Sequence, residues 1–263
     1  MSPAKLKIKR VLGGLCASRD RSAARRIVLL YHSIGGSPWS VFEREFRRHI
    51  EWLASEAAIV PLMDVFGGRP EPLQVSITFD DGYESLHRLA LPVLRDAGAA
   101  GAVFLTTNWI AVETRKQSEP ARGHYPQERF LLWHEVETLA EAGWTVGSHG
   151  AEHPDLSVQA EETVRTELRV SRAAIESALG GCAPVFSYPW GRHTAGVRRL
   201  VAEAGYTHAV AGIHGPVTQR SDPYAIPRID IARDYTFDDF KAIVRGDWDY
   251  LGWLQRARAF ARA

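Results

Sequence analysis

Residues 74–98 read QVSITFDDGYESLHRLALPVLRDAG. The run from Gln74 to Phe79 is mostly apolar and β-branched, and it has the length of a strand. The segment from Tyr83 to Ala97 has the apolar spacing of an amphipathic helix, and Gly98 follows it, where a left-handed helix end is least costly. This stretch therefore predicts a strand followed by a helix, with two carboxylates at the point where the strand ends.

The same alternation recurs along the chain. Further strands are predicted at residues 27–31, 102–106, 144–146, 185–187, 208–211 and 226–231, and further helices at 42–57, 133–142, 157–179 and 194–204. Such βα units predict one α/β domain, either a closed or incomplete barrel or an open doubly wound sheet. In a barrel the chemistry lies at the carboxyl ends of the strands. Residues 111–130 follow one such end and predict a rim loop or lid.

Composition and charge narrow the class of protein. The 263 residues are 45% hydrophobic and 24% charged, which is typical of a globular protein with room for one large domain. The net charge is +1, yet residues 1–26 hold eight basic side chains against one acid, so the remaining chain is slightly acidic. This argues against nucleic acid as a partner. We expect a basic extension at 1–26, the main domain at 27–246 and an amphipathic tail at 247–263.

The two ends carry no clear membrane-spanning or export signal. No run of about 18 apolar residues exists, and the apolar part of the basic start is too short for a secretory signal. We therefore expect a cytoplasmic protein. Peripheral contact with the anionic inner face of a membrane is one interpretation of the basic start and of the tail, which mixes aromatic residues with arginines. A solvated tail or an ordinary docking helix is the other.

Two adjacent acids, Asp80 and Asp81, stand where the strand at 74–79 stops. Buried carboxylates are costly unless they are paired or bind metal, and neighbouring residues in a strand point to opposite faces. Gly82 permits a turn that would give the two carboxylates different roles. Taken alone, the same residues would also serve as a turn and helix cap.

Two histidines follow the strand at 144–146. His149 and His153 are four residues apart, so one helical turn would bring them to the same side. With Asp81 they would form a three-ligand site for zinc or a related divalent ion, with positions left open for water and substrate. Glu152 does not create the zinc-protease motif, because that motif has its glutamate directly after the first histidine.

Residues 186–191 read FSYPWG, at the end of a later predicted strand. A bend at Pro189 and Gly191 would aim a backbone N–H at a developing oxyanion. As an isolated pattern it is equally typical of an ordinary turn.

These three segments, in this order, resemble the polysaccharide deacetylase superfamily, carbohydrate esterase family 4, over roughly residues 27–231. The resemblance implies an irregular, incomplete (β/α) barrel of about seven strands, with a catalytic domain at 27–246. It implies that Asp80 is the catalytic base and that the metal ligands are Asp81, His149 and His153. It also implies that the Trp190 backbone N–H forms the oxyanion hole and that Tyr188, Pro189 and Trp190 line the substrate groove.

The sequence departs from the family pattern at three points. Gly150 stands where the family usually has Ser or Thr, so a hydrogen bond near the metal is expected to be missing. Ser187 stands where an arginine often pairs with the base, and Arg228 is a candidate replacement from a neighbouring strand end. The general acid has no clean match, and His32 and His214 are the candidates.

The expected activity is metal-dependent removal of N-acetyl groups from amino sugars of a glycan or lipid-linked saccharide. The expected cofactor is zinc, with cobalt, manganese, nickel or iron as other divalent ions. A glycan-binding protein on the same scaffold and an iron enzyme with two histidines and one carboxylate remain as alternatives.

Overall fold

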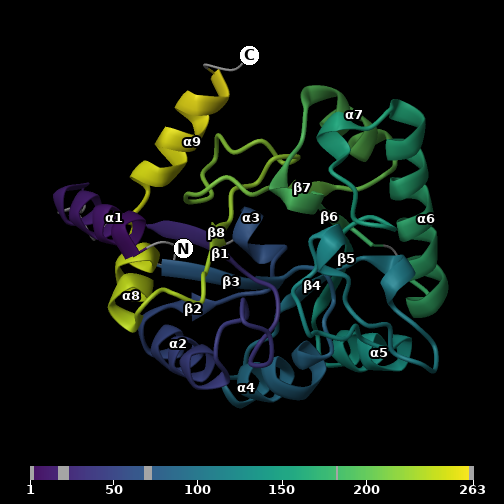
Figure 1. Ribbon diagram of the computed structural model, residues 1–263, viewed down its shortest axis with the longest axis horizontal. Coiled ribbons are helices and arrows are strands. Elements are labelled where there is room, and N and C mark those ends of the chain that lie inside the picture. Colours follow the sequence, from purple (N-terminus) through teal and green to yellow (C-terminus); the bar gives the residue numbers. More distant parts are fainter. Residues whose placement is uncertain (1–2, 17–23, 68–72, 182, 261–263) are drawn as a thin grey trace.

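The computed structural model describes residues 3–16, 24–67, 73–181 and 183–260, and its centre is a parallel sheet (Figure 1). The strand order is β7-β6-β5-β4-β3-β1-β8, and β2 pairs with β3 off this path. The strands are β1 Arg25–Tyr31, β2 Ala58–Ile59, β3 Leu73–Phe79, β4 Ala102–Leu105, β5 Thr145–Ser148, β6 Val185–Ser187, β7 His208–Val210 and β8 Ile229–Asp230. The predicted incomplete barrel of about seven strands is confirmed.

The last predicted strand, 226–231, is split between the two edges of the curled sheet. Ile226 bridges to Val210 of β7, whereas Ile229 and Asp230 form β8 and pair with β1. The connecting segment therefore crosses the seam between the first and last strands. Arg228 lies in this crossing segment, with its backbone N–H bonded to Ile213.

Helices cover the outside of the sheet (Figure 1). They are α1 Pro3–Cys16, α2 Glu43–Glu56, α3 Asp64–Gly67, α4 Leu91–Asp96, α5 Trp133–Glu141, α6 Glu161–Leu179, α7 Ala195–Glu203, α8 Phe237–Arg245 and α9 Tyr250–Phe260. The helix predicted at 83–97 is shorter: a π-helical turn at Leu86–Ala90 precedes α4, and Pro92 occupies the first turn of α4. None of the described helices is long and apolar enough to cross a bilayer.

Two apolar clusters follow from the alternation of side chains along the strands. On one face of the sheet, Val75, Ile77 and Phe79 of β3 join the large cluster beneath the helices. The other face carries a smaller cluster that includes Val28, Phe104 and residues of α3. Ser76, Thr78 and Asp80 alternate with Val75, Ile77 and Phe79, so their side chains point to the other face of the sheet. The strand pattern thus turns Asp80 toward the inside of the curled sheet.

The N-terminal helix α1 lies beside α8 and α9 (Figure 1). The predicted basic extension is thus helical over residues 3–16, whereas residues 17–23 and the last residues of the tail, 261–263, lie outside the described residues.

Candidate active site

Asp80 is buried at the end of β3 and is held by a charged partner. Its two oxygens each accept a hydrogen bond from Arg228, at 2.7 Å from Nη1 and 2.7 Å from Nη2. The Ser187 hydroxyl donates to the same carboxylate at 3.1 Å and accepts from Arg228 Nη2 at 2.8 Å. The structure thus brings together the predicted base and its candidate partner, and Ser187 joins them.

The charge of Asp80 is stabilised by this arrangement. Burial by itself would raise the pKa of Asp80, but the positive charge of Arg228 and the Arg228 hydrogen bonds outweigh it, and His149 adds to this lowering only when its ring is protonated. The pKa of Asp80 is therefore held well below its usual range. A carboxylate with a fixed, bidentate arginine stays ionised at neutral pH.

Asp81, His149 and His153 form a second, separate group. All three are buried, and one ligand atom from each lies within 4.8 Å of the others. Asp81 Oδ1 is 3.6 Å from His149 Nε2 and 3.5 Å from His153 Nε2. That oxygen has no hydrogen-bond partner among the described residues. One carboxylate and two imidazoles are a donor set that suits a divalent transition metal, so these residues fit the predicted cation.

Hydrogen bonds to backbone carbonyls orient both imidazoles. His149 Nδ1 donates to the Ser187 carbonyl at 2.8 Å, and His153 Nδ1 donates to the Arg122 carbonyl at 3.3 Å. A carbonyl only accepts, so each ring carries a proton on Nδ1 and turns Nε2 toward Asp81. Burial lowers the pKa of His149 to about 4, which keeps the ring neutral as a metal ligand requires.

The prediction that a helical turn brings the two histidines together is wrong. Residues 149–153 form a loop, in which Gly150 has φ +83° and His153 has φ +68°. Glu167 Oε2 holds this loop by accepting the N–H groups of Ala151 at 2.7 Å and Glu152 at 3.0 Å. A Cβ at Gly150 would lie 2.9 Å from the same oxygen. The departure from the family pattern at Gly150 thus accompanies a left-handed turn that favours glycine.

Backbone strain is concentrated at the site. The described non-glycine residues with positive φ are Asp81, Gln127, His153 and Trp190. Three of these four are predicted site residues. The left-handed conformation costs a non-glycine residue on the order of 1 kcal/mol or more, and it persists where surrounding contacts impose it. At Asp81 it turns the chain so that neighbouring carboxylates face different groups.

Trp190 lies between the metal-ligand group and the predicted lid. Its ring centroid is 5.4 Å from that of His153, and its side chain is 49% exposed. The indole packs over Gly123, where any Cβ would overlap it. Since Arg122 of the same loop also accepts the His153 hydrogen bond, the loop at 111–130 contacts the site at two points.

Tyr188 and Pro189 do not fit the predicted role of lining the substrate groove. Both are buried, and the Tyr188 hydroxyl donates to the Tyr224 carbonyl at 2.8 Å. The ring packs against Phe186 in the core. Tyr188 follows Phe186 by two residues, so its side chain points to the same core face of the sheet. Of the three residues Tyr188, Pro189 and Trp190, Trp190 is the one whose side chain reaches the surface.

The two candidate acids have different surroundings. The ring of His32 stacks on Tyr125 at 4.8 Å. Burial acts to raise the pKa of Asp80 and of Asp81, and the interaction with His32 is one of several that lower both pKa values instead. His32 therefore lies near the two carboxylates. His214 lies against α9 instead, with Nε2 4.0 Å from Asp249. The structure therefore groups only His32 with the site.

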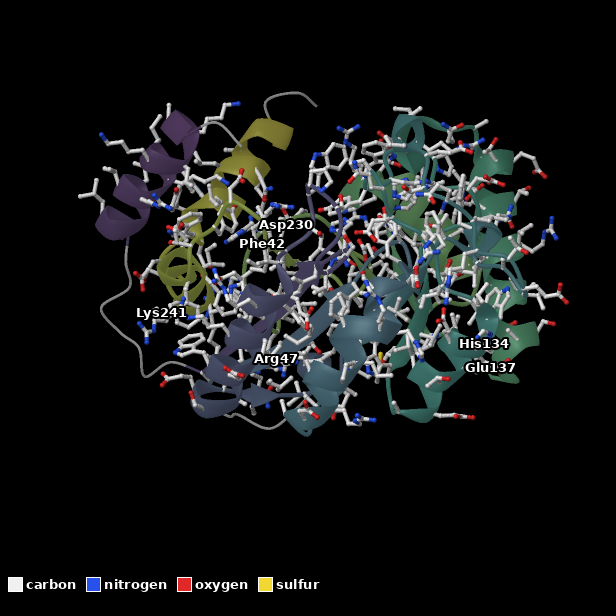
Figure 2. All side chains as sticks on the ribbon, turned by 60° about the horizontal axis from the view of Figure 1, so that its bottom comes forward. Phe42, Arg47, His134, Glu137, Asp230 and Lys241 are labelled. Atoms are coloured by element: carbon white, nitrogen blue, oxygen red, sulfur yellow. The ribbon has the colours of Figure 1, made fainter. Side chains whose placement is uncertain are left out.

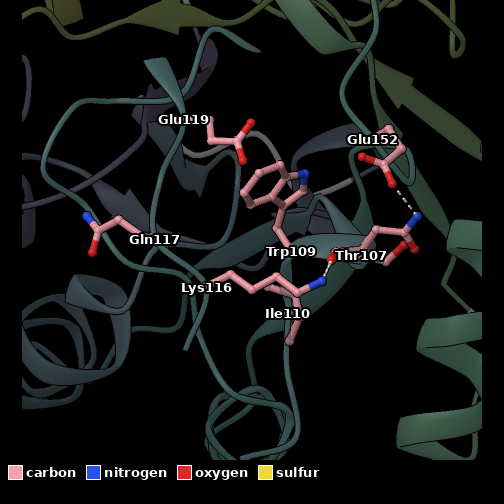
Figure 3. Close-up of a pocket in the computed structure, with 8 residues that line it drawn as sticks. Thr107, Trp109, Ile110, Lys116, Gln117, Glu119 and Glu152 are labelled. Atoms are coloured by element: carbon pink, nitrogen blue, oxygen red, sulfur yellow. Dashed lines mark hydrogen bonds between the residues drawn. The ribbon is translucent and has the colours of Figure 1, made fainter. Parts of the chain in front are cut away.

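Two pockets that share Glu152 lie beside His153 and the loop at 111–130. One pocket is lined by Arg122, Glu152, His153, Pro154, Asp155, Trp190 and Arg192. The next, drawn in Figure 3, is lined by Thr107, Asn108, Trp109, Ile110, Lys116, Gln117, Glu119 and Glu152. Glu152 belongs to both, and it accepts a hydrogen bond from Asn108 Nδ2 at 2.7 Å (Figure 3). No local pattern predicts this second pocket, because its residues come from three separate segments.

Comparison with known proteins agrees with this architecture. The Bacillus subtilis protein YxkH is 25% identical over 236 residues, covering 86% of this chain and 78% of YxkH. A poly-β-1,6-N-acetyl-D-glucosamine N-deacetylase of Staphylococcus aureus is 23% identical over 215 residues, covering 74% of this chain and 69% of that protein.

Solved structures share the fold. IcaB from Ammonifex degensii superposes with a TM-score of 0.73 at 19% identity, covering 86% of this chain and 98% of that one. The Streptococcus pyogenes deacetylase PplD superposes with a TM-score of 0.71 at 17% identity, covering 84% of this chain and 99% of that one. The sequence model of the polysaccharide deacetylase family matches residues 67–209, more than half of the chain. The chain therefore belongs to the polysaccharide deacetylase family.

Proposed function

We propose that this carbohydrate N-deacetylase hydrolyses the acetamide of an N-acetylated amino sugar, with a divalent cation held by Asp81, His149 and His153 and with Asp80 as the base. The observation that carries the proposal is the buried ligand group beside the Asp80–Arg228 pair, with His149 Nε2 only 3.8 Å from Asp80 Oδ2. The Staphylococcus aureus relative, named for an N-acetylglucosamine polymer, supports the substrate class.

Zinc suits the proposed ligand set best, and cobalt, manganese, nickel and iron are compatible with the same donors. When bound, the cation would supply Lewis acidity, polarising the acetyl carbonyl and lowering the pKa of water. The protein contributes the orientation of the two imidazoles, through the Ser187 and Arg122 carbonyls, and a carboxylate oxygen that accepts no hydrogen bond from any described residue.

Asp80 removes a proton from the attacking water. Arg228 donates to both carboxylate oxygens, and the single Ser187 hydroxyl proton occupies a further lone pair on only one of them, so the other oxygen keeps a lone pair that can accept this proton. The water oxygen then forms a bond to the acetyl carbon. The Trp190 N–H donates to the resulting oxyanion, a contribution worth about 10²–10³ in rate at comparable sites. The left-handed turn at Trp190, φ +61°, sets the direction of this N–H.

The last step breaks the C–N bond and releases acetate and the free amino sugar. The leaving nitrogen needs a proton, and His32 is the proposed donor because it lies near both carboxylates. Stacking on Tyr125 holds the His32 ring in place. Trp190 is the exposed aromatic residue of this site that a sugar ring could stack on.

Acetate release tests the proposal. Zinc-loaded protein would be assayed with N-acetylglucosamine oligomers and with lipid-linked N-acetyl sugars, beside Asp80→Asn and His149→Ala. We expect both variants to lose at least about 10²-fold in rate. Matched changes at exposed positions, Asp96→Asn and His134→Ala, should retain the native rate.

Each outcome separates the alternatives. Acetate release by Asp80→Asn at the native rate would show that Asp80 is not the base. Zinc binding by the native protein without turnover of any substrate would favour the glycan-binding alternative. Acetate release under anaerobic conditions with zinc would exclude the iron-oxygenase alternative, which assigns no role to the Asp80–Arg228 pair.

A further inference from the structure

Helix α1 is fixed to the body of the protein along one face. Arg10 donates to both oxygens of Asp239, at 2.8 Å and 2.6 Å. Lys9 donates to the Tyr235 hydroxyl at 2.9 Å. Gly13 is buried against Trp248, and a Cβ there would lie 2.6 Å from the indole. These contacts fix the orientation of α1, so the face opposite Lys9, Arg10 and Gly13 points away from the protein.

The opposite face of α1 is apolar and exposed. Ile8 is 59% exposed, Leu15 78%, Val11 57% and Leu12 37%. Helical geometry places these four side chains in one stripe about 100° wide. Together with Trp253 of α9, 68% exposed, they make up half of the ten exposed large hydrophobic residues among the described parts of the chain. Figure 2 shows α1 and α9 side by side at one end of the molecule.

Basic residues border this stripe. Lys5 and Lys7 are exposed, and the helical period places one on each side of the apolar residues. The helix sequence, PAKLKIKRVLGGLC, contains no acid, and Arg256 of α9 is also exposed. An apolar stripe between long basic side chains is the pattern of a helix that lies in the plane of a bilayer surface, where the cations reach the headgroups.

We propose that the exposed face of α1, with Trp253 of α9, binds the surface of a bilayer that contains anionic lipids. Anionic headgroups complement Lys5, Lys7 and Arg256, whereas a second copy of this chain packed on the same face would bring like charges together. The apolar side chains are too few for more than shallow insertion, so the attachment is peripheral and reversible.

The proposed docking face adjoins the active site. Burial raises the pKa of Asp230, at the end of β8, and the charges of His32 in the site and of Lys9 in α1 both act to lower it. Asp230 therefore lies within electrostatic reach of both residues. In Figure 2 the Asp230 label stands at the end of the molecule that carries α9 and α1. Bilayer binding through α1 would therefore place the β1 and β8 rim of the site next to the lipid surface.

Vesicle flotation with the full chain tests the proposal. The vesicles would be phosphatidylcholine alone or phosphatidylcholine with about one third phosphatidylglycerol. We expect the native protein to float with the anionic vesicles at least ten-fold more than with the neutral ones, and less so at high salt. The triple variant Ile8→Gln, Leu12→Gln, Leu15→Gln should stay in the soluble fraction.

The matched control is Val158→Gln, which removes an exposed apolar side chain outside α1 and α9. It should float like the native protein. All variants should keep the native circular dichroism and the native acetate release from soluble oligomers, so a failure of lipid binding is distinct from a failure of the proposed function. Equal recovery of the native protein with both vesicles would overturn the proposal. So would self-association, measured by sedimentation, that the triple change abolishes.

Discussion

The two sides of the site, one around Asp80 and one around Asp81, treat neighbouring carboxylates in opposite ways. Asp80 is surrounded by donors, with Arg228 on both oxygens and Ser187 beside them. Asp81 Oδ1 faces Nε2 of His149 at 3.6 Å and Nε2 of His153 at 3.5 Å, and it has no hydrogen-bond partner among the described residues. Both oxygens of Asp80 are therefore paired with donors, whereas Asp81 keeps one oxygen, Oδ1, that a bound cation would satisfy under the proposed function.

This difference in surroundings explains how two neighbouring residues, Asp80 and Asp81, can have the two different roles proposed for them. Burial penalises both carboxylates, so each needs compensation. For Asp80 the protein provides it permanently, which keeps a base ionised. For Asp81 we propose that the bound cation provides it, which would make the group a binding site. The predictions that follow test this division, in order of decreasing effect.

The largest effect should come from breaking the Asp80–Arg228 pair. Arg228→Met leaves a buried carboxylate unpaired, and Asp80→Asn leaves a buried guanidinium unpaired. Each change should lower the free energy of unfolding by about 3–5 kcal/mol. Denaturant unfolding of the single and double variants forms a double-mutant cycle. The double variant should lose much less than the sum, and additive losses would contradict a mutually dependent pair.

Asp81 should behave in the opposite way. Asp81→Asn removes a buried negative charge whose Oδ1 accepts no hydrogen bond from any described residue. Without metal, the free energy of unfolding of the variant should therefore be no lower than that of the native protein. Zinc at about 100 times its dissociation constant should stabilise the native protein by about 2.7 kcal/mol and the variant not at all. Thermal unfolding with and without a chelator measures both. A metal-free Asp81→Asn protein as destabilised as Asp80→Asn would remove the distinction between the two sides.

The pH dependence of metal-free stability should reveal the neutral imidazole. The pKa of His149 is about 4 in the folded protein and about 6.5 when unfolded. Between these values the unfolded chain binds a proton that the folded protein does not, so stability falls as pH falls. The loss from pH 7 to pH 5 should be about 2 kcal/mol from this group. His149→Gln should show a shallower slope in urea unfolding, and an unchanged slope would contradict the assignment.

The carboxyl of Asp80 should act at lower pH. Its pKa in the folded protein lies below the unfolded value of about 4. Its contribution to the free energy of unfolding is therefore fully present above about pH 4 and is lost as the pH falls from there toward the folded pKa.

The smallest effect should come from Ser187→Ala. The hydroxyl bridges Asp80 and Arg228, but the two direct bonds remain without it. We expect a loss of about 1 kcal/mol in unfolding free energy and less than a ten-fold change in acetate release. A larger loss in acetate release would mean that Ser187 positions the base more strongly than Arg228 does.

Much of the fold followed from local pattern. The seven predicted strands lie at the positions of β1 and β3 to β8, because apolar runs of strand length ended by turn residues depend little on distant contacts. The grouping of Asp81, His149 and His153 also followed, since the carboxyl ends of the parallel strands β3 and β5, which are separated only by β4, lie at the same end of the barrel.

What the sequence did not reveal depends on contacts between distant segments. The loop at 149–153 is held by Glu167 from α6 rather than by its own helical hydrogen bonds. The burial of Tyr188 depends on Tyr224, which lies 36 residues away along the chain. The docking of α1 depends on Asp239 and Trp248 near the other end of the chain. No local periodicity encodes such pairings.

The left-handed residues have a consequence for protein engineering. A sequence chosen only for stability on this backbone would place glycine at positions 81, 153 and 190, since glycine adopts positive φ without strain. Those substitutions would delete two of the three proposed metal ligands and the exposed indole of the groove. The most obvious stabilising changes are therefore the ones that would abolish function, and a thermostable variant must gain its stability at positions away from the site.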